Sequence, residues 1–226
     1  MKPHPDIVEF LARCGVGDTR DAALATMEGF RERLAAANRE TNLTRLVTPE
    51  DFWTKHVADS LALGLVKPEI ADSALSLADV GCGGGFPLVP LAWGFPALKL
   101  SGIESRPRKA AFVEGAVAAL GLANCRVIAR QAREVCGLPG WAGYFDGVVA
   151  RAVGDAEWLL SEARGLLRPG RGAFLALYKT PASVSDELPA ARRVAARSGF
   201  AVSVPAAFDL PLGAGRRQFL ILTRRA

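Results

Sequence analysis

Short apolar runs alternate with longer segments of helical composition from residue 75 onwards, and this alternation restricts the possible folds more than any other feature. The runs are LSLADV, LKLSGI, CRVIA, FDGVVA, GAFLAL, FAVSV and QFLILT. Five strands separated by helices predict a parallel sheet covered on both faces. The last two runs are separated only by PAAFDLPLGAGRR, too short for a helical crossover, which predicts an antiparallel hairpin at the sheet edge. We therefore expect an α/β fold, a doubly wound, mostly parallel sheet of seven strands, whose ligand lies beyond the carboxyl ends of the strands.

The first seventy residues have a helical pattern. In residues 21–38 apolar side chains recur at helical spacing, and the charged residues 31–33 are expected to turn outward. A second helix is expected from Thr48, with Pro49 in its first turn and Asp51 as a capping-box acid. We expect residues 1–72 to form a helical cap and residues 73–226 a Rossmann-like domain, together one compact unit. The apolar face of the first helix consists of Leu24, Met27, Phe30 and Leu34.

Composition excludes several classes of protein. The net charge of +5 permits a polyanionic partner without requiring one. The four cysteines show no CxxC spacing and no nearby histidine cluster, which indicates a reducing compartment and no metal site. No run of about twenty apolar residues occurs, and the N-terminus lacks the apolar segment of a secretory signal. We expect a cytoplasmic, monomeric protein without a membrane span.

The sequence LADVGCGGGFPLVP (77–90) indicates a ligand that contacts bare main chain. Glycines fall at the alternate positions Gly81, Gly83 and Gly85, directly after the first strand. A P-loop would end in Gly-Lys-Ser/Thr, but Phe86 and Pro87 occupy that place, so a P-loop is excluded. The dinucleotide fingerprint lacks its third glycine, and Pro87 offers no N–H to a pyrophosphate. The loop therefore suits a nucleoside without a phosphate at this point.

Two acids complete this interpretation. Glu104 follows the second strand, 23 residues after Gly81, where an acid can accept hydrogen bonds from ribose hydroxyls. Asp79, just before the glycines, could form an ion pair with an ammonium group of the ligand. Adenosine, ribose and an ammonium without phosphate describe S-adenosylmethionine, and the pattern is typical of class I S-adenosylmethionine-dependent methyltransferases.

The sequence lacks the motifs that are typical of two classes of methyl acceptor. After the fourth strand the chain has Arg151-Ala152-Val153 in place of the Asn/Asp-Pro-Pro-aromatic clamp usual for exocyclic amines. No cysteine follows a proline, which disfavours transfer to carbon 5 of a pyrimidine. Guanine N7 already carries a lone pair and needs mainly alignment. His56 leaves a mechanism with a base open.

In combination, these motifs resemble a known family, the bacterial 16S rRNA guanine-N7 methyltransferases (RsmG, also called GidB). The resemblance runs from about Asn38 to Ile221. DVGCGGGFPLVPLA is similar to the family's DVGTGxGFPGxPLA, with Cys82 and Leu88 as departures. The further matches are Asn42-Leu43-Thr44, the His-x-x-Asp-Ser element at His56, Asp59 and Ser60, Glu104-Ser105 followed by Arg108, Lys109 and Phe112, Phe145-Asp146 through Arg151-Ala152, and Lys179.

The resemblance implies methylation of a guanosine in the 530 loop of 16S rRNA, either naked or within the small ribosomal subunit. It places Gly81, Phe86, Ala132, Arg133 and Arg151 around S-adenosylmethionine, with Glu104 on the ribose; the glycine-loop argument adds Asp79, Gly83 and Gly85. Arg133 stands where the family usually has an acid, so an acidic side-chain contact is lost there, and Thr180 replaces a glycine after Lys179. Arg151 is the one candidate for a catalytic role, with a structural salt bridge as its alternative.

Two further groups of residues are candidates. One group is expected to form a lid against the cofactor pocket: Asn42, His56, Asp59 and Ser60. The alternative is that His56 and Asp59 cap or staple the helical appendage. The other either follows RNA phosphates or forms a solvated surface: Arg106, Arg108, Lys109, Lys179, Arg216 and Arg217. Three other functions remain open: a class I methyltransferase acting on a small molecule or protein, a non-catalytic nucleotide- or RNA-binding module, and a nicotinamide dehydrogenase.

Overall fold

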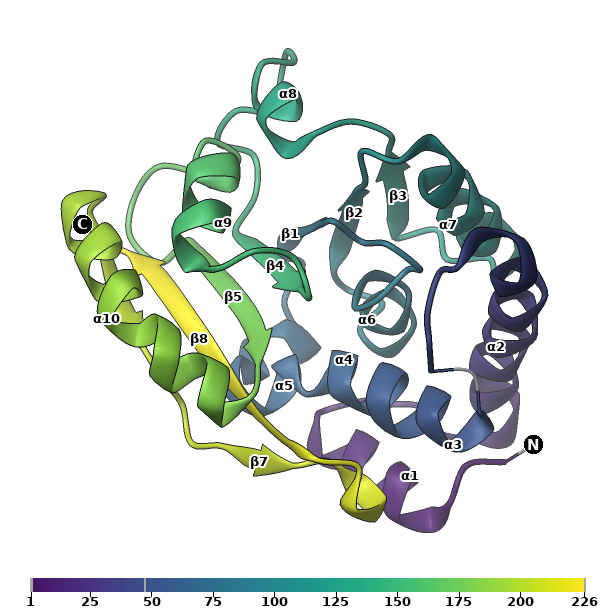
Figure 1. Cartoon of the computed structure of the whole chain (residues 1–226). Helices are drawn as coiled ribbons and strands as arrows, with labels where there is room; N and C mark the ends of the chain where they lie inside the picture. The colour runs from purple at the N-terminus through teal and green to yellow at the C-terminus, as the bar shows by residue number, and fades with distance from the viewer. Residues whose placement is uncertain (1, 47, 226) are drawn as a thin grey trace.

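The computed structural model describes residues 2–46 and 48–225. A helical layer comes first and a single mixed sheet follows (Figure 1). The helical layer comprises α1 (Pro5–Arg13), α2 (Asp21–Thr41), α3 (Pro49–Asp51), the π-helix η1 (Phe52–Ala58), α4 (Asp59–Leu61), α5 (Leu63–Val66) and the 3₁₀-helix η2 (Pro68–Ala71). No helix within the described residues is long and apolar enough to cross a membrane.

The remainder alternates strands and helices as predicted. Its elements are β1 (Ser76–Val80), α6 (Leu88–Gly94), β2 (Lys99–Ile103), α7 (Pro107–Ala119), β3 (Cys125–Ile128), α8 (Ala132–Cys136), β4 (Gly147–Arg151), α9 (Ala156–Ala163), β5 (Phe174–Lys179), α10 (Pro181–Arg197), β6 (Phe200–Ser203), β7 (Phe208–Asp209), the 3₁₀-helix η3 (Pro211–Gly213) and β8 (Arg216–Arg224).

The strand order is β3-β2-β1-β4-β5-β8-β6. The first five strands are parallel, and β8 and β6 form the predicted antiparallel hairpin at the edge. The sequence missed β7, a two-residue strand that pairs with β8 inside the hairpin connection. The order reverses between β1 and β4, so the loops after these strands open a crevice between them.

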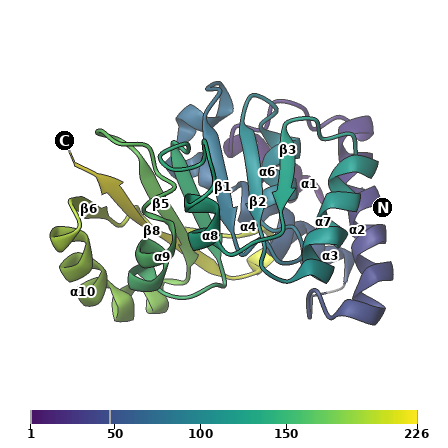
Figure 2. The ribbon, with the colours of Figure 1, turned by 90° about the horizontal axis from the view of Figure 1, so that it is seen from above.

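Alternate residues of each strand face two apolar cores. Leu77 and Val149 lie in the core shared with α2, α6 and α7, whereas Ala78 and Val148 face α9 and α10. Helices thus cover both faces of the sheet, as the view in Figure 2 shows. Side chains of the helical layer and of the sheet share the first core. The division at residue 72 stays a prediction.

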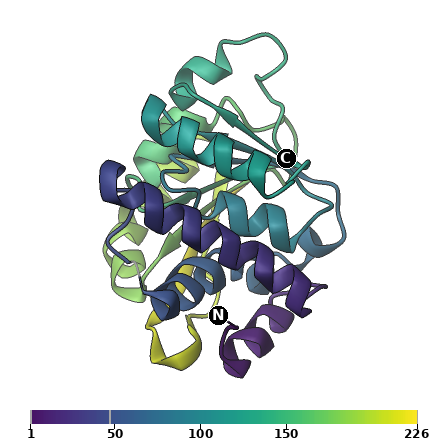
Figure 3. The ribbon, with the colours of Figure 1, turned by 90° about the vertical axis from the view of Figure 1, so that its right-hand side faces the viewer.

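Helix α2 buries the predicted face, Leu24, Met27, Phe30 and Leu34, and packs beside α7 (Figure 3). One detail of the prediction was wrong, because Arg31 is half-buried and pairs with Glu28. Thr48 caps the next helix as expected, since its hydroxyl oxygen accepts a hydrogen bond from the Asp51 amide. The π-helical segment that follows was not predicted. Its wider turns are often found at functional sites.

Candidate active site

The loop after β1 has a backbone that requires glycine. Gly81, Gly83 and Gly85 have φ values of +74°, +56° and +91°, a region that side chains disfavour. A Cβ at Gly81 would lie 2.5 Å from the side chain of Val153, whereas one at Gly83 would come no closer than 3.7 Å to the Gly81 carbonyl. Gly83 is thus required for its conformation, and its main chain faces open space.

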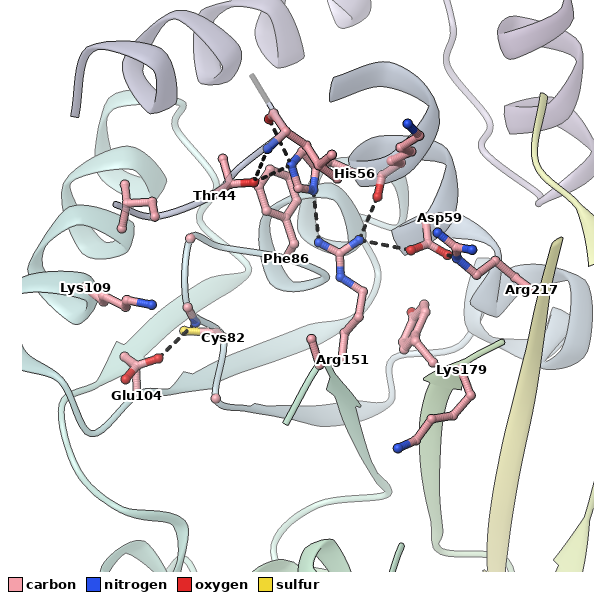
Figure 4. Close-up of a pocket in the computed structure, with 18 of the residues that line it drawn as sticks. Thr44, His56, Asp59, Cys82, Phe86, Glu104, Lys109, Arg151, Lys179 and Arg217 are labelled. Carbon is pink, nitrogen blue, oxygen red and sulfur yellow. Dashed lines mark hydrogen bonds and ion pairs between the residues drawn. The ribbon is translucent and has the colours of Figure 1, made fainter. Parts of the chain in front are cut away.

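A cavity of about 610 Å³ opens where β1, β2, β4 and β5 end. Figure 4 shows its walls. They are formed by Leu43, Thr44, Leu46, Lys55, His56, Asp59, Gly81, Cys82, Gly83, Gly84, Phe86, Glu104, Arg106, Lys109, Arg151, Ala152, Tyr178, Lys179, Thr180, Ser183 and Arg217. A second cavity of about 230 Å³ shares Gly81 with it and is lined by Val80, Ile103, Ser105, Arg130, Gln131, Ala132, Trp158 and Glu162.

Glu104 joins the glycine loop to the end of β2. Its Oε2 accepts a hydrogen bond from the Gly83 amide at 3.0 Å, and its Oε1 accepts one from the Arg106 amide at 2.8 Å. The side chain is buried on the cavity wall. Each carboxylate oxygen has a second lone pair, so Glu104 keeps acceptor capacity for a ligand hydroxyl.

Asp79 lies beneath the glycine loop and lines neither cavity. Its Oδ2 accepts a hydrogen bond from the Leu88 amide, and its Oδ1 is buried with no partner among the described residues. Burial raises the pKa of this carboxyl from 3.8 to about 7, against the lowering effects of the Leu88 hydrogen bond and of Arg151. The ammonium contact of Asp79 stays a prediction.

Arg151 connects β4 to the helical layer. Its guanidinium donates to the Lys55 carbonyl at 2.9 Å, to Asp59 Oδ2 at 3.1 Å and to His56 Nδ1 at 3.1 Å (Figure 4). It also lies over the ring of Phe86, 5.3 Å from the centroid. Arg151 therefore forms the structural ion pair that was its alternative role, and it also lines the cavity. Its contact with the cofactor stays a prediction.

His56 is held neutral by this arrangement. Because a guanidinium is always a donor, Nδ1 must accept, and the ring proton lies on Nε2, which faces Thr44 Oγ1 at 3.1 Å. Burial, and next the charge of Arg151, lower the pKa of His56 from 6.5 to about 3. The imidazole stacks on Phe86 with centroids 4.2 Å apart. His56 thus fixes the loop side chain.

The four lid candidates separate. His56 and Asp59 lie on the cavity wall, whereas Ser60 is buried behind it, where its carbonyl accepts from the Tyr178 hydroxyl. Asn42 is exposed and ends α2 in a left-handed conformation, with φ +46°.

Ala132 lines the second cavity, whereas Arg133 lines neither cavity. The guanidinium of Arg133 points to Glu162 of α9, with which it forms an ion pair. Among the predicted loop residues, Gly85 also lines neither cavity, because it is packed between Val89 and Phe30.

The predicted RNA-binding cations fall into two groups. Arg106, Lys109, Lys179 and Arg217 line the main cavity, whereas Arg108 and Arg216 lie outside it. Lys179 donates to Glu187 at 2.6 Å and to the Gly154 carbonyl, and Arg217 Nε lies 3.2 Å from Asp59 Oδ1. Lys109 makes no ion pair within residues 2–46 and 48–225.

The sequence did not predict Tyr178, Thr44, Cys82 and Lys55 as wall residues. Tyr178 could have been found, because it directly precedes Lys179 at the carboxyl end of a predicted parallel strand. Thr44 and Lys55 carry no such signal. Within the described part of the chain, no cluster of His, Cys, Asp and Glu could hold a metal ion.

Gly83→Val is expected to abolish cofactor binding, at least 100-fold in affinity, with a loss of only about 1–2 kcal/mol in unfolding free energy from the left-handed φ. The branched side chain would project into the space that the loop leaves for a ligand. Calorimetric titration with S-adenosylhomocysteine measures the affinity. Gly121→Val is the matched control, because Gly121 has φ +66°, open space around it and no place on either cavity. Equal affinities of the two variants would remove the loop from the site.

The comparisons with known proteins agree with this geometry. The family described as "rRNA small subunit methyltransferase G" (GidB) matches residues 23–210. A protein of that name from Sorangium cellulosum is 40% identical over 170 residues, which cover 75% of this chain and 70% of the relative. One from Stenotrophomonas maltophilia is 37% identical over 205 residues, 90% of this chain and 88% of the relative.

Solved structures show the fold. Cofactor-bound Rv0187 from MTB superposes with a TM-score of 0.59 at 20% identity, covering 100% of this chain and 99% of that one. A SAM-dependent methyltransferase from Aquifex aeolicus superposes with a TM-score of 0.57 at 16% identity, covering 80% and 96%. The fold is that of class I methyltransferases, the resemblance seen in the sequence is confirmed, and the chain belongs to the rRNA small subunit methyltransferase G family.

Proposed function

We propose that this protein transfers a methyl group from S-adenosyl-L-methionine to N7 of a guanosine in the 530 loop of 16S rRNA. Membership of the rRNA small subunit methyltransferase G family supports the enzyme class and the RNA substrate. The enzyme acts as a monomer in the cytoplasm.

The residues present fit the cofactor. Glu104 offers acceptors for the ribose, and the main chain of Gly81 and Gly83 faces the cavity. The buried carboxylate of Asp79, whose Oδ1 has no partner among the described residues, adds negative charge beneath the loop for a cationic amino-acid end. S-adenosyl-L-methionine supplies an electrophilic methyl group on its sulfonium.

The neutral, hydrogen-bonded imidazole of His56 is the observation that supports guanine N7 as the methyl acceptor. This imidazole lines the cavity, yet its Nδ1 accepts from Arg151 and its pKa is lowered to about 3, so it is a poor general base. Burial also raises the pKa of the Cys82 thiol far above its ordinary value, which disfavours a thiolate nucleophile. An acceptor that brings its own lone pair and loses no proton suits this site, and guanine N7 is such an atom.

Catalysis then rests on alignment. Arg151 fixes Phe86 and His56 from one side, and Asp59 fixes the guanidinium from the other. A rigid wall of this kind holds the acceptor nitrogen in line with the methyl group, and such positioning lowers the barrier by several kcal/mol. The cationic side chains that line the main cavity attract the phosphates of the RNA backbone.

Lys109→Ala is expected to weaken RNA binding several-fold and to reduce the slope of log affinity against log salt by about 1, because one phosphate contact is lost. Filter binding of 16S rRNA at several salt concentrations measures both. Arg197→Ala is the control, since Arg197 ends α10 far from the cavity and is exposed. An unchanged slope for Lys109→Ala would remove that residue from the RNA surface.

The experiment that tests the function is transfer of labelled methyl from S-adenosylmethionine to unmodified 16S rRNA and to unmodified small subunits, followed by nucleoside analysis. We expect labelled 7-methylguanosine, mapped to the 530 loop. Label in another nucleoside would overturn the N7 assignment. Cofactor binding without label in RNA would favour a small-molecule or protein substrate.

A further inference from the structure

A cluster of cationic and aromatic side chains lies towards the amino ends of β2 and β3, away from the main cavity. Strand β3 is the last strand on its side of the described sheet (Figure 2). Lys99 begins β2, and Arg126 is the second residue of β3. Trp141 and Tyr144 come from the connection between α8 and β4. We call these four residues the edge cluster.

The guanidinium of Arg126 is held by aromatic rings and a hydroxyl group, not by an acid. Its Cζ lies 4.3 Å from the ring centroid of Trp141 and 5.6 Å from that of Tyr144, and its Nε donates to Ser101 Oγ at 3.0 Å. The two rings contact each other and the buried ring of Phe145. The terminal nitrogens of Arg126 have no hydrogen-bond partner among the residues that the structure describes, so their donors remain available to a ligand.

A cavity of about 210 Å³ opens beside this guanidinium. Lys99, Arg126 and Tyr144 are among its walls, and none of the described residues that line it is acidic. Neither of the two cations forms an ion pair in the described part of the chain. The side chain of Tyr144 is 40% exposed, which is unusual for a large ring in this protein. Unpaired cations bind phosphates and an exposed ring stacks on a base, so this combination fits RNA.

The edge cluster and the main cavity lie towards opposite ends of the same strand. Glu104, which lines the main cavity, directly follows β2, whereas Lys99 begins it, so the two sites lie about 16 Å apart along the strand. Arg130 is a further exposed cation at the cavity end of β3. An RNA whose target nucleotide occupies the main cavity can therefore reach the edge cluster with neighbouring nucleotides.

We propose that the edge cluster is a second contact for the rRNA substrate. Arg126 and Lys99 bind backbone phosphates outside the target loop, and Tyr144 stacks on an unpaired base. The inference rests on the proposed function, because it takes rRNA as the substrate. The edge cluster lines neither the main cavity nor the second one, so it contributes to RNA binding and not to the methyl transfer step.

Filter binding of naked 16S rRNA at several salt concentrations tests the proposal. Arg126→Ala and Lys99→Ala should each weaken binding about three- to tenfold and reduce the slope of log affinity against log salt by about 0.7–1, the value for one lost phosphate contact. Tyr144→Ala should weaken binding about fivefold or more without a change in slope, whereas Tyr144→Phe keeps the ring and should bind as the wild type does. Arg193→Ala is the control, because Arg193 is exposed on α10 and, within residues 2–46 and 48–225, also forms no ion pair.

Two further measurements separate RNA binding from folding and from chemistry. The affinity for S-adenosylhomocysteine should be unchanged in every variant, which shows that the fold is intact. Methyl transfer to 16S rRNA should show a KM raised about three- to tenfold with kcat unchanged, as expected where only substrate binding is lost. Arg126→Lys keeps the charge and should restore the salt slope. If Arg126→Ala does not fold, Lys99→Ala still tests the surface, because the side chain of Lys99 is exposed.

A hairpin that carries only the 530 loop should bind the wild type and the variants alike, and an equal loss on that hairpin would overturn a contact outside the target loop. Wild-type affinity and slope in both Arg126→Ala and Lys99→Ala would overturn the second contact while the methyltransferase function stands. A loss seen only with assembled small subunits would indicate a ribosomal protein as the partner and overturn the RNA assignment. A wild type that neither binds nor methylates 16S rRNA would overturn the proposed function instead.

Discussion

Arg151→Ala is expected to lower methyl transfer at least 100-fold and the free energy of unfolding by about 3–5 kcal/mol, the range for breaking a buried ion pair. Arg151 is 15% exposed and holds three acceptors together, of which Asp59 is a buried carboxylate. Without the guanidinium, Asp59 would retain only Arg217 among the residues that the structure describes, and the stack of Phe86 on His56 would lose the group that fixes it. Activity and stability therefore fall together.

Three measurements check this expectation. Methyl transfer and urea denaturation give the two losses, and an NMR titration of His56 should show its pKa rising above about 3, because one of the two effects that lower it is gone. Arg151→Lys should restore only part of the stability, since an ammonium lacks the planar fork that serves three acceptors. Arg197→Ala, an exposed ion-pair arginine, should change stability by less than about 0.5 kcal/mol. A stable, active Arg151→Ala protein would contradict the positioning role.

Asp79→Asn is expected to stabilise the free protein at pH 8 by up to about 4 kcal/mol, the penalty of ionising this carboxyl in the folded state, and to weaken cofactor binding at least tenfold. The aspartate is fully buried, and its ionised form is destabilised by burial, which raises its pKa to about 7. Asparagine keeps an acceptor for the Leu88 amide and removes the charge. The same substitution removes the negative charge that would neutralise the ammonium group of the cofactor. A carboxylate that destabilises the fold and supports binding is expected at a functional site.

The sign of the pH dependence follows from the direction of this shift. Between pH 3.8 and about 7 the folded state holds a proton on Asp79 that the unfolded state has released. The contribution of Asp79 to the free energy of unfolding is therefore fully present below pH 3.8 and is lost as pH rises through about 7. The total loss is about 4 kcal/mol, because the pKa differs by about three units between the folded and unfolded states. Comparing wild type and Asp79→Asn by denaturation at pH 5 and pH 8 isolates it. Equal stability differences at both pH values would contradict the raised pKa.

The parts of the site that depend on local backbone were predictable. Gly81 and Gly83 lie in a tight turn after a parallel strand, and the positive φ of such a turn restricts the residue type directly. Glu104 follows the neighbouring strand, and adjacent parallel strands end at the same edge of a sheet. Sequence order alone therefore places the loop and the acid together, as the hydrogen bond from Gly83 to Glu104 shows.

The parts of the site that depend on side-chain partners could not be predicted from the sequence. Lys179 and Arg217 were predicted as RNA-binding cations, yet each has an acidic neighbour from another element. The side chain of Arg133 pairs with an acid 29 positions away, whereas the predicted place of Arg133 beside the cofactor stays a prediction. Such pairs form between elements that the sheet brings together, and spacing in the chain carries no record of them.

By itself the sequence determined the doubly wound sheet, the bare loop and the acid that holds it, because apolar periodicity and glycine conformation act within a few residues. Only the tertiary structure decided that Arg151 of β4 would meet Asp59 and His56, about 95 residues earlier, and that His56 would be neutral. The physical reason is burial. The charge state of a side chain depends on which groups surround it after the chain has excluded water, and that environment exists only in the folded protein.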